Sequence, residues 1–309
     1  MTGLVNTSRY RAHLELLRPP LAPMDLAMPA ASALLASYSL TGDLPALMPF
    51  IIATLGAYCA ITSSYVLNDF YDVEVDKIGM PGRPLPSAQV SSREALIYAL
   101  LLLGTAALSA LYLNPESMVT LAAATAIITV YSAWAKRNTP FSWAFVGLAF
   151  GLVPLGVWLA VEPAGVLRQG PGLHPASLML ALMICITDWG FTNCDASRDV
   201  EGDRKNGIPT FPVTYGIPAT ARMVAFFWLC GIVLSIAMGL SAGLGLLYLG
   251  AAGVAGTWLL WQNLDFVRNP TASRGEMLFY QSANYRAVLF AALIADVLIR
   301  TALPFQSML

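Results

Sequence analysis

Nine stretches of mostly apolar residues, each close to the length of a membrane-spanning helix, follow one another along this chain of 309 residues. An α-helix needs about 20 such residues to cross the hydrocarbon core of a bilayer. The pattern therefore predicts an all-α integral membrane protein with about nine transmembrane helices. The predicted spans cover residues 22–41, 46–67, 95–113, 117–134, 142–161, 175–194, 221–240, 243–262 and 286–304.

The composition supports the same class. The residues are 57% hydrophobic and 11% charged, whereas a soluble domain is about 25% charged. The net charge is −1 and the sequence contains no basic run, so we expect no nucleic-acid partner. We predict a single polytopic membrane domain over residues 1–309, with a polar N-terminal arm at about 1–20.

Lysine and arginine are distributed unevenly between the two sets of connections. Only Arg168 and Arg300 fall on one side. Cytoplasmic connections are rich in Lys and Arg, so we expect the N-terminus and the basic connections in the cytoplasm and the C-terminus on the opposite side. The basic set is Arg9, Arg11, Arg18, Lys77, Arg83, Arg93, Lys136, Arg137, Arg198, Arg204, Lys205, Arg222, Arg268, Arg274 and Arg286.

Two acidic motifs of matched spacing follow the second and sixth predicted spans, on the basic side. They read NDFYDVEVD, from position 68, and DASRDVEGD, from position 195. If each span continues as a helix, four residues advance it by about 400°, so residues at that spacing share one face. Like charges placed there repel, and compensating cations are needed. The aligned side chains are Asn68, Asp72 and Asp76 in the first motif and Asp195, Asp199 and Asp203 in the second.

Magnesium is the cation that suits these donors. Mg²⁺ binds through a few carboxylates and completes its shell with water and substrate phosphate, and neither motif contains the His or Cys that zinc or copper prefers. A single acidic cluster at a helix end is usually solvated surface, but two matched clusters favour a site. Basic side chains at or beside these motifs are expected to contact phosphate. For each of them, the alternative is that it is present only because cytoplasmic connections are rich in Lys and Arg. They are Arg83, Arg198, Arg204 and Lys205.

At this point the chain resembles the UbiA superfamily of intramembrane prenyltransferases, over nearly its whole length. The likeness rests on Arg18-Pro19 before the first span, on NDFYDVEVD with GRPLPS behind it, on YSAWAKR after the fourth span and on DASRDVEGDRKNG after the sixth. It implies nine transmembrane helices around a central cavity that opens sideways to lipid. It also implies two facing aspartate motifs that hold a prenyl diphosphate through Mg²⁺.

The resemblance carries roles to individual residues. Asn68, Asp72, Asp76, Asp195, Asp199 and Asp203 match the metal-binding motifs. Arg18, Tyr131 and Lys136 match positions near the diphosphate, and Asp188 matches a further acidic position. Asp188 precedes Asp195 by two helical turns, so it is expected to face the same cavity deeper in the membrane. Asp69 points about 100° away from Asn68, which suggests a structural role.

An allylic diphosphate ionises when the charge of its leaving group is neutralised and water is excluded. Aromatic faces stabilise the cation, and Trp189 and Phe191 are the first candidates because they precede the second motif. The others, each with helix packing as the alternative, are Phe70, Tyr71, Trp134, Trp158 and Tyr285.

The acceptor is left open as an aromatic, lipid or chlorin-type molecule. Asp25 and Asp188 either orient it or are buried hydrogen-bonding partners. The predicted function is prenyl transfer. A terpene cyclase of the same superfamily is the alternative. A transporter is less favoured, because the acidic residues gather at one membrane face and are not spread through the midplane.

Overall fold

The computed structural model describes residues 2–164, 167 and 170–302, and these form helices joined by short connections without a strand. The long helices are α2 (Ala22–Thr41), α3 (Leu47–Gly79), α4 (Ser92–Leu113), α5 (Pro115–Val130), α7 (Trp143–Val161), α8 (Pro175–Arg198), α11 (Ile217–Ser241), α12 (Leu246–Arg268) and α13 (Ala272–Ala302). The short ones are α1 (Thr2–Glu15), η1 (Pro19–Leu21), η2 (Tyr131–Ala135), α6 (Lys136–Asn138), α9 (Val200–Lys205) and α10 (Phe211–Tyr215).

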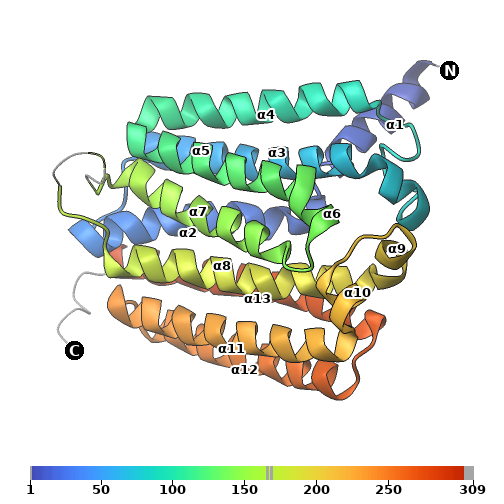
Figure 1. The fold of residues 1–309 in the computed structure, drawn as a ribbon. Coiled ribbons are helices and arrows are strands. Elements are labelled where there is room, and N and C mark those ends of the chain that lie inside the picture. Colours follow the sequence, from blue (N-terminus) through green and yellow to red (C-terminus); the bar gives the residue numbers. More distant parts are fainter. Residues whose placement is uncertain (1, 165–166, 168–169, 303–309) are drawn as a thin grey trace.

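The long helices run side by side in one bundle (Figure 1). Helices α3, α4 and α5 form one side and α11 and α12 the other, with α2, α7, α8 and α13 between them. The short helices α1, α9 and α10 gather at one end of the bundle, where α3 also ends. Both acidic motifs therefore lie at the same end.

Seven helical segments of the described chain are long and apolar enough to cross a membrane. Helices α2 and α12 form where spans were predicted but are not among the seven, so the count of nine stays a prediction. Helix α2 carries Asp25 and Pro29, which lower its hydropathy. Charged groups within apolar spans avoid lipid because exposure there is costly, and Asp25, Asp188 and Asp296 are all buried.

The last span begins earlier than the sequence predicted. Helix α13 starts at Ala272 and not at residue 286. Its first half contains polar and charged residues, among them Arg274, Glu276 and Asn284, so hydropathy alone did not detect it. As a consequence Arg286, assigned above to a basic connection, lies inside α13 and is 3% exposed. That assignment was wrong.

Glycines allow α8 to pack closely between α7 and α11. A Cβ on Gly147 would lie 2.3 Å from Cδ1 of Trp189, and one on Gly231 would lie 2.1 Å from Cγ2 of Thr187. Helices in membranes associate through such close contacts, because lipid tails provide little hydrophobic drive. The small residues thus fix the position of the helix that carries Asp188 and Asp195.

Candidate active site

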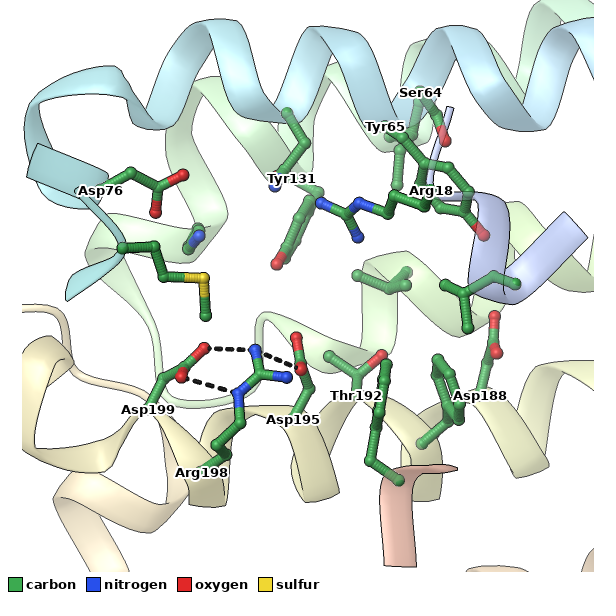
Figure 2. A pocket seen from close by; sticks show the side chains of 18 of the residues that line it. Arg18, Ser64, Tyr65, Asp76, Tyr131, Asp188, Thr192, Asp195, Arg198 and Asp199 are labelled. Carbon is green, nitrogen blue, oxygen red and sulfur yellow. Dashed lines mark hydrogen bonds and ion pairs between the residues drawn. The ribbon is translucent and has the colours of Figure 1, made fainter. Parts of the chain in front are cut away.

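A cavity of about 270 Å³ lies between α3 and α8, lined on its other sides by α5, η2, α7, α9, α13 and the start of α2. Figure 2 shows Asp76 and Asp199 toward one end of it and Asp188 toward the other. The predicted site residues that line it are Arg18, Asn68, Asp76, Arg83, Tyr131, Lys136, Asp188, Asp195, Arg198, Asp199 and Asp203. Most of the predicted set is therefore brought together.

Three predicted site residues do not line this cavity. Asp72 is buried behind it, only 1% exposed. Arg204 is paired at 2.8 Å with Glu201 on the exposed face of α9, and Lys205 is also exposed. The two basic residues were predicted as phosphate contacts, and the structure does not bring them to the cavity wall.

The first motif lies on a continuous helix, as predicted, because α3 runs on to Gly79. Asn68 presents an amide oxygen, Oδ1, that is buried and has no hydrogen-bond partner in the described chain. Asp76 pairs with Arg83 at 2.7 Å. Asp72 pairs with Lys136, and Arg137 lies 3.3 Å from its other oxygen.

The second motif is not one continuous helix. Helix α8 ends at Arg198, and Asp199 adopts φ −92° and ψ 8° before α9 begins. Asp195, Asp199 and Asp203 were expected on one helix, and the break at Asp199 differs from that expectation, but all three side chains still line the cavity. Asp203 reaches the cavity from α9, where Thr210 Oγ1 donates to its Oδ2 at 3.1 Å.

Charge pairing also orders the second motif. Arg198 contacts Asp195 at 2.8 Å and Asp199 at 2.9 Å (Figure 2). Burial raises the pKa of Asp203 to about 6, and the nearby carboxylates of Asp199 and Asp195 add to the rise, against the opposing effects of Lys136 and the Thr210 hydrogen bond. A cation bound beside Asp203 would favour the ionised form of this carboxyl group.

Asp69 has a structural role, as its position relative to Asn68 suggested. Its Oδ1 lies 3.1 Å from Arg18 and 3.6 Å from Arg83, so one buried carboxylate holds two cavity arginines. The guanidinium of Arg18 also lies 4.6 Å from the ring centroid of Tyr65. Arg18 has φ +51°, a left-handed conformation uncommon outside glycine. These contacts position the arginine against the cavity.

A π-helical turn brings Tyr131 and Lys136 to the same wall. In an α-helix, residues five apart differ by about 140° around the axis. The segment Tyr131–Ala135 is instead π-helical, with wider i→i+5 bonding, which places such residues nearly above one another. Both side chains consequently line the cavity.

The deep end of the cavity contains a buried ion pair. Arg286 Nη1 lies 2.7 Å from Asp188 Oδ1, and both side chains are 3% exposed. Arg286 also donates from Nη2 to Thr187 Oγ1 at 2.8 Å. Sequence reasoning missed Arg286, and its only signal was that Asp188, inside an apolar span, needs a counter-charge.

The aromatic lining differs from the prediction. Phe191 lines the cavity, as do Phe150 and Phe279, which were not anticipated. The centroid of Phe191 lies 4.2 Å from that of Phe279. Trp189 packs away from the cavity, with its centroid 5.4 Å from that of Trp143. The remaining aromatic candidates, Phe70, Tyr71, Trp134, Trp158 and Tyr285, do not line it either.

The residues present fit a magnesium ion by donor type. Oxygen donors face the cavity from both motifs, and the unpartnered amide oxygen of Asn68 is one of them. Within the described ranges no three acidic, His or Cys side chains already converge as a metal site. Instead, most of the motif carboxylates have a basic partner, so a metal ion would have to replace some of these pairs.

Comparison with known proteins finds a family match and relatives along most of the chain. The model of the UbiA prenyltransferase family matches residues 26–293. The chain is 26% identical over 261 residues to the digeranylgeranylglyceryl phosphate synthase of Thermococcus sibiricus, covering 84% of this chain and 88% of that protein. It is 30% identical over 299 residues to the protoheme IX farnesyltransferase of Salinispora tropica, covering 93% and 89%.

Solved structures share the fold. The apo structure of a UbiA homolog from Aeropyrum pernix matches with a TM-score of 0.72 at 19% identity, covering 89% of this chain and 97% of that one. The structure of a UbiA homolog from Archaeoglobus fulgidus bound to GPP and Mg²⁺ matches with a TM-score of 0.58 at 18% identity, covering 92% and 99%.

Proposed function

The chain belongs to the UbiA prenyltransferase family, and from this premise we propose that it is a Mg²⁺-dependent enzyme that ionises a polyprenyl diphosphate and transfers the prenyl group to a lipophilic acceptor. The observation that carries the proposal is the pair of acidic motifs on opposite walls of one cavity, each interleaved with basic side chains. A relative of this fold with GPP and Mg²⁺ bound supports it.

The six predicted ligands are assigned as follows. Asn68 and Asp76 would hold metal on the α3 side, and Asp195, Asp199 and Asp203 on the α8–α9 side. Asp72, buried behind the cavity wall, would join the α3 set only when Lys136 releases it. Bound Mg²⁺ supplies the positive charge that neutralises a departing diphosphate.

The basic side chains act on the phosphate directly. Arg83, Arg198 and Lys136 each hold a motif carboxylate. If those oxygens held a metal ion, the guanidinium and ammonium groups would be free to donate to phosphate oxygens, with the short charge-assisted bonds that stabilise a leaving group. Arg18 is kept at the cavity by Asp69 and does not need to move.

The apolar part of the cavity protects the prenyl cation. Phe150, Phe191 and Phe279 line it beside the second motif. Their rings exclude water and present π faces to a developing positive charge. The prenyl chain would extend from there between the helices, in contact with membrane lipid.

Orientation forms part of the proposal. The basic connections at the motif end support a cytoplasmic N-terminus and cytoplasmic active-site loops, with the C-terminus on the opposite side. Removing Arg286 from the count leaves this bias strong, because the far side still has only Arg168 and Arg300. Cytosolic prenyl diphosphate would then enter from the side where the motifs lie.

The test uses purified protein in liposomes with geranylgeranyl diphosphate and Mg²⁺, first without an acceptor. We expect little pyrophosphate release until an acceptor is added, and none in Asp72→Asn. Prompt release with a cyclic product and no acceptor would identify a cyclase. Turnover that is unchanged in excess chelator would refute the metal-dependent mechanism.

A further inference from the structure

A second hollow, of about 350 Å³, opens between the end of α12 and the start of α13. Helix α12 contributes Trp258, Trp261 and Arg268 to it, and α13 contributes Arg274. The connection between these helices lies at the same end of the bundle as α9 and α10 (Figure 1). None of the described residues that line the hollow also lines the main cavity, so the hollow is separate from the candidate active site.

The two ends of this hollow differ in chemistry. Trp258 and Trp261 lie within the predicted span 243–262, and they are 47% and 71% exposed on the outer surface of α12. Arg268 ends the same helix, about 15 Å from Trp258 along the axis. The hollow thus runs from an aromatic surface inside the membrane domain to a cationic end. An occupant that fills it must be apolar at one end and anionic at the other.

The cationic end has N–H donors without a protein partner. Arg274 pairs with Asp265 at 2.5 Å, and the other oxygen of this carboxylate accepts from Asn269 at 3.0 Å. Arg268 forms no ion pair with an acidic side chain of the described chain. Gln262 also lines the hollow, and its Nε2 is buried without a hydrogen-bond partner among the described residues. One acidic and two basic side chains therefore leave a positive charge and free donors for an anion.

Two general trends place such residues near a membrane surface. Cytoplasmic connections are rich in arginine, and membrane interfaces are rich in tryptophan. Neither trend requires the side chains to converge. Here two tryptophans, two arginines and an unpartnered amide line a single hollow. The convergence indicates a ligand.

We infer that this hollow binds an anionic glycerophospholipid of the surrounding bilayer. Its phosphate accepts from the guanidinium groups of Arg268 and Arg274, whose planar donors match phosphate oxygens. The indole rings of Trp258 and Trp261 contact the glycerol region and the first methylene groups of the chains, as such rings do at membrane interfaces. Free phosphate would leave the aromatic surface uncovered, and a soluble protein would not reach Trp258 inside the span.

The lipid site lies against a helix start that supports the second acidic motif. Gly275 follows Arg274, and a Cβ on it would lie 2.8 Å from Cβ of Ser197 in the last turn of α8. Phe279, one turn further along α13, lines the main cavity. A lipid bound to Arg274 therefore holds the start of α13 in place against α8.

Native mass spectrometry of the purified protein in a neutral detergent tests the inference. The probes are dioleoylphosphatidylglycerol and dioleoylphosphatidylcholine, which have the same chains and a phosphate but differ in net charge. We expect the first phosphatidylglycerol to bind at least about fivefold more tightly, the effect of one cationic side chain near a membrane surface. Arg268→Gln with Arg274→Gln should abolish this preference.

The matched control is Arg93→Gln with Arg222→Gln. It also removes two positive charges from the basic connections, but neither residue lines the hollow. This control should retain the preference for phosphatidylglycerol. An equal loss in both double variants would mean that overall charge attracts the lipid, and the specific site would be overturned.

Asp265→Asn tests the same site in the opposite direction. It removes the carboxylate that competes for Arg274 and adds one net positive charge. Phosphatidylglycerol should therefore bind about threefold more tightly or better. Misfolding cannot imitate a gain of affinity. Unchanged or weaker binding would show that the arginines do not hold a lipid phosphate.

Two further outcomes would assign the hollow to another occupant. Complete displacement of phosphatidylglycerol by excess inorganic phosphate would make it a free-anion site. A dimer that dissociates in the arginine double variant, with no preference between the two lipids, would make it a contact between copies of this chain. Either result would overturn the lipid inference and leave the proposed prenyl transfer standing.

Discussion

Asp72 and Lys136, 64 residues apart in the sequence, form an ion pair in which the side chain of Asp72 is 2% exposed and that of Lys136 is 18% exposed. The pair joins the first motif to the π-helical turn. It explains how a buried carboxylate is tolerated beside the cavity before any metal binds.

Replacing Asp72 by Asn should lower kcat/KM at least about 100-fold, the scale of losing one preorganised electrostatic contact in a transition state. Asn keeps the size of the side chain, and the double variant with Lys136→Met removes the unpaired ammonium. We expect both to insert and unfold at near wild-type temperature in liposomes. Wild-type turnover in Asp72→Asn would remove this residue from the metal set.

Deleting Ala133 should convert the π-helical turn into α-helix. The exposed Ala133 lies within Tyr131–Ala135. Shortening the segment by one residue leaves Tyr131 and Lys136 four residues apart in an α-helix, about 40° from each other around the axis, so both should still face the cavity and kcat/KM for the diphosphate should stay within about threefold of wild type. Ala133→Ser keeps the length and serves as the control, and a loss of at least about 100-fold in the deletion variant alone would show that the π-helical turn itself is required.

Arg83→Ala should raise the KM for geranylgeranyl diphosphate by about 10-fold or more, because a hydrogen bond to a charged group contributes roughly 1.5–3 kcal/mol. Lys77→Ala is the matched control, since Lys77 is exposed and pairs with Glu74 at 2.7 Å. Arg204→Ala and Lys205→Ala should resemble the control because neither lines the cavity. An equal rise in KM for Arg83→Ala and Lys77→Ala would mean that general surface charge is responsible.

Removing Mg²⁺ with a chelator should stop turnover, and excess Mg²⁺ should restore it. Calorimetry of Mg²⁺ binding gives a sharper measurement. Because the motif carboxylates have basic partners, the substrate-free protein should bind Mg²⁺ weakly, and it should bind Mg²⁺ tightly only together with the diphosphate. Tight binding of Mg²⁺ to the substrate-free protein would contradict the exchange of partners proposed above.

The sequence predicted the fold class and the two motifs well, because hydropathy and helical spacing are local properties. It placed the first motif correctly on an extended α3. It placed Asp203 at the cavity but did not predict the helix break at Asp199, where neither Gly nor Pro stands. It failed at Arg286 and could not name the partners of Asp69, because these depend on contacts with distant segments that no local pattern records.

The pairing of motif carboxylates with arginine and lysine has a consequence for selectivity among ions. A substrate-free site in which most motif carboxylates are already paired with arginine or lysine should attract stray divalent ions only weakly. If the diphosphate arrives already bound to magnesium, the choice of metal is made in solution before the substrate reaches the membrane. The enzyme then does not need a coordination cage that distinguishes magnesium from calcium.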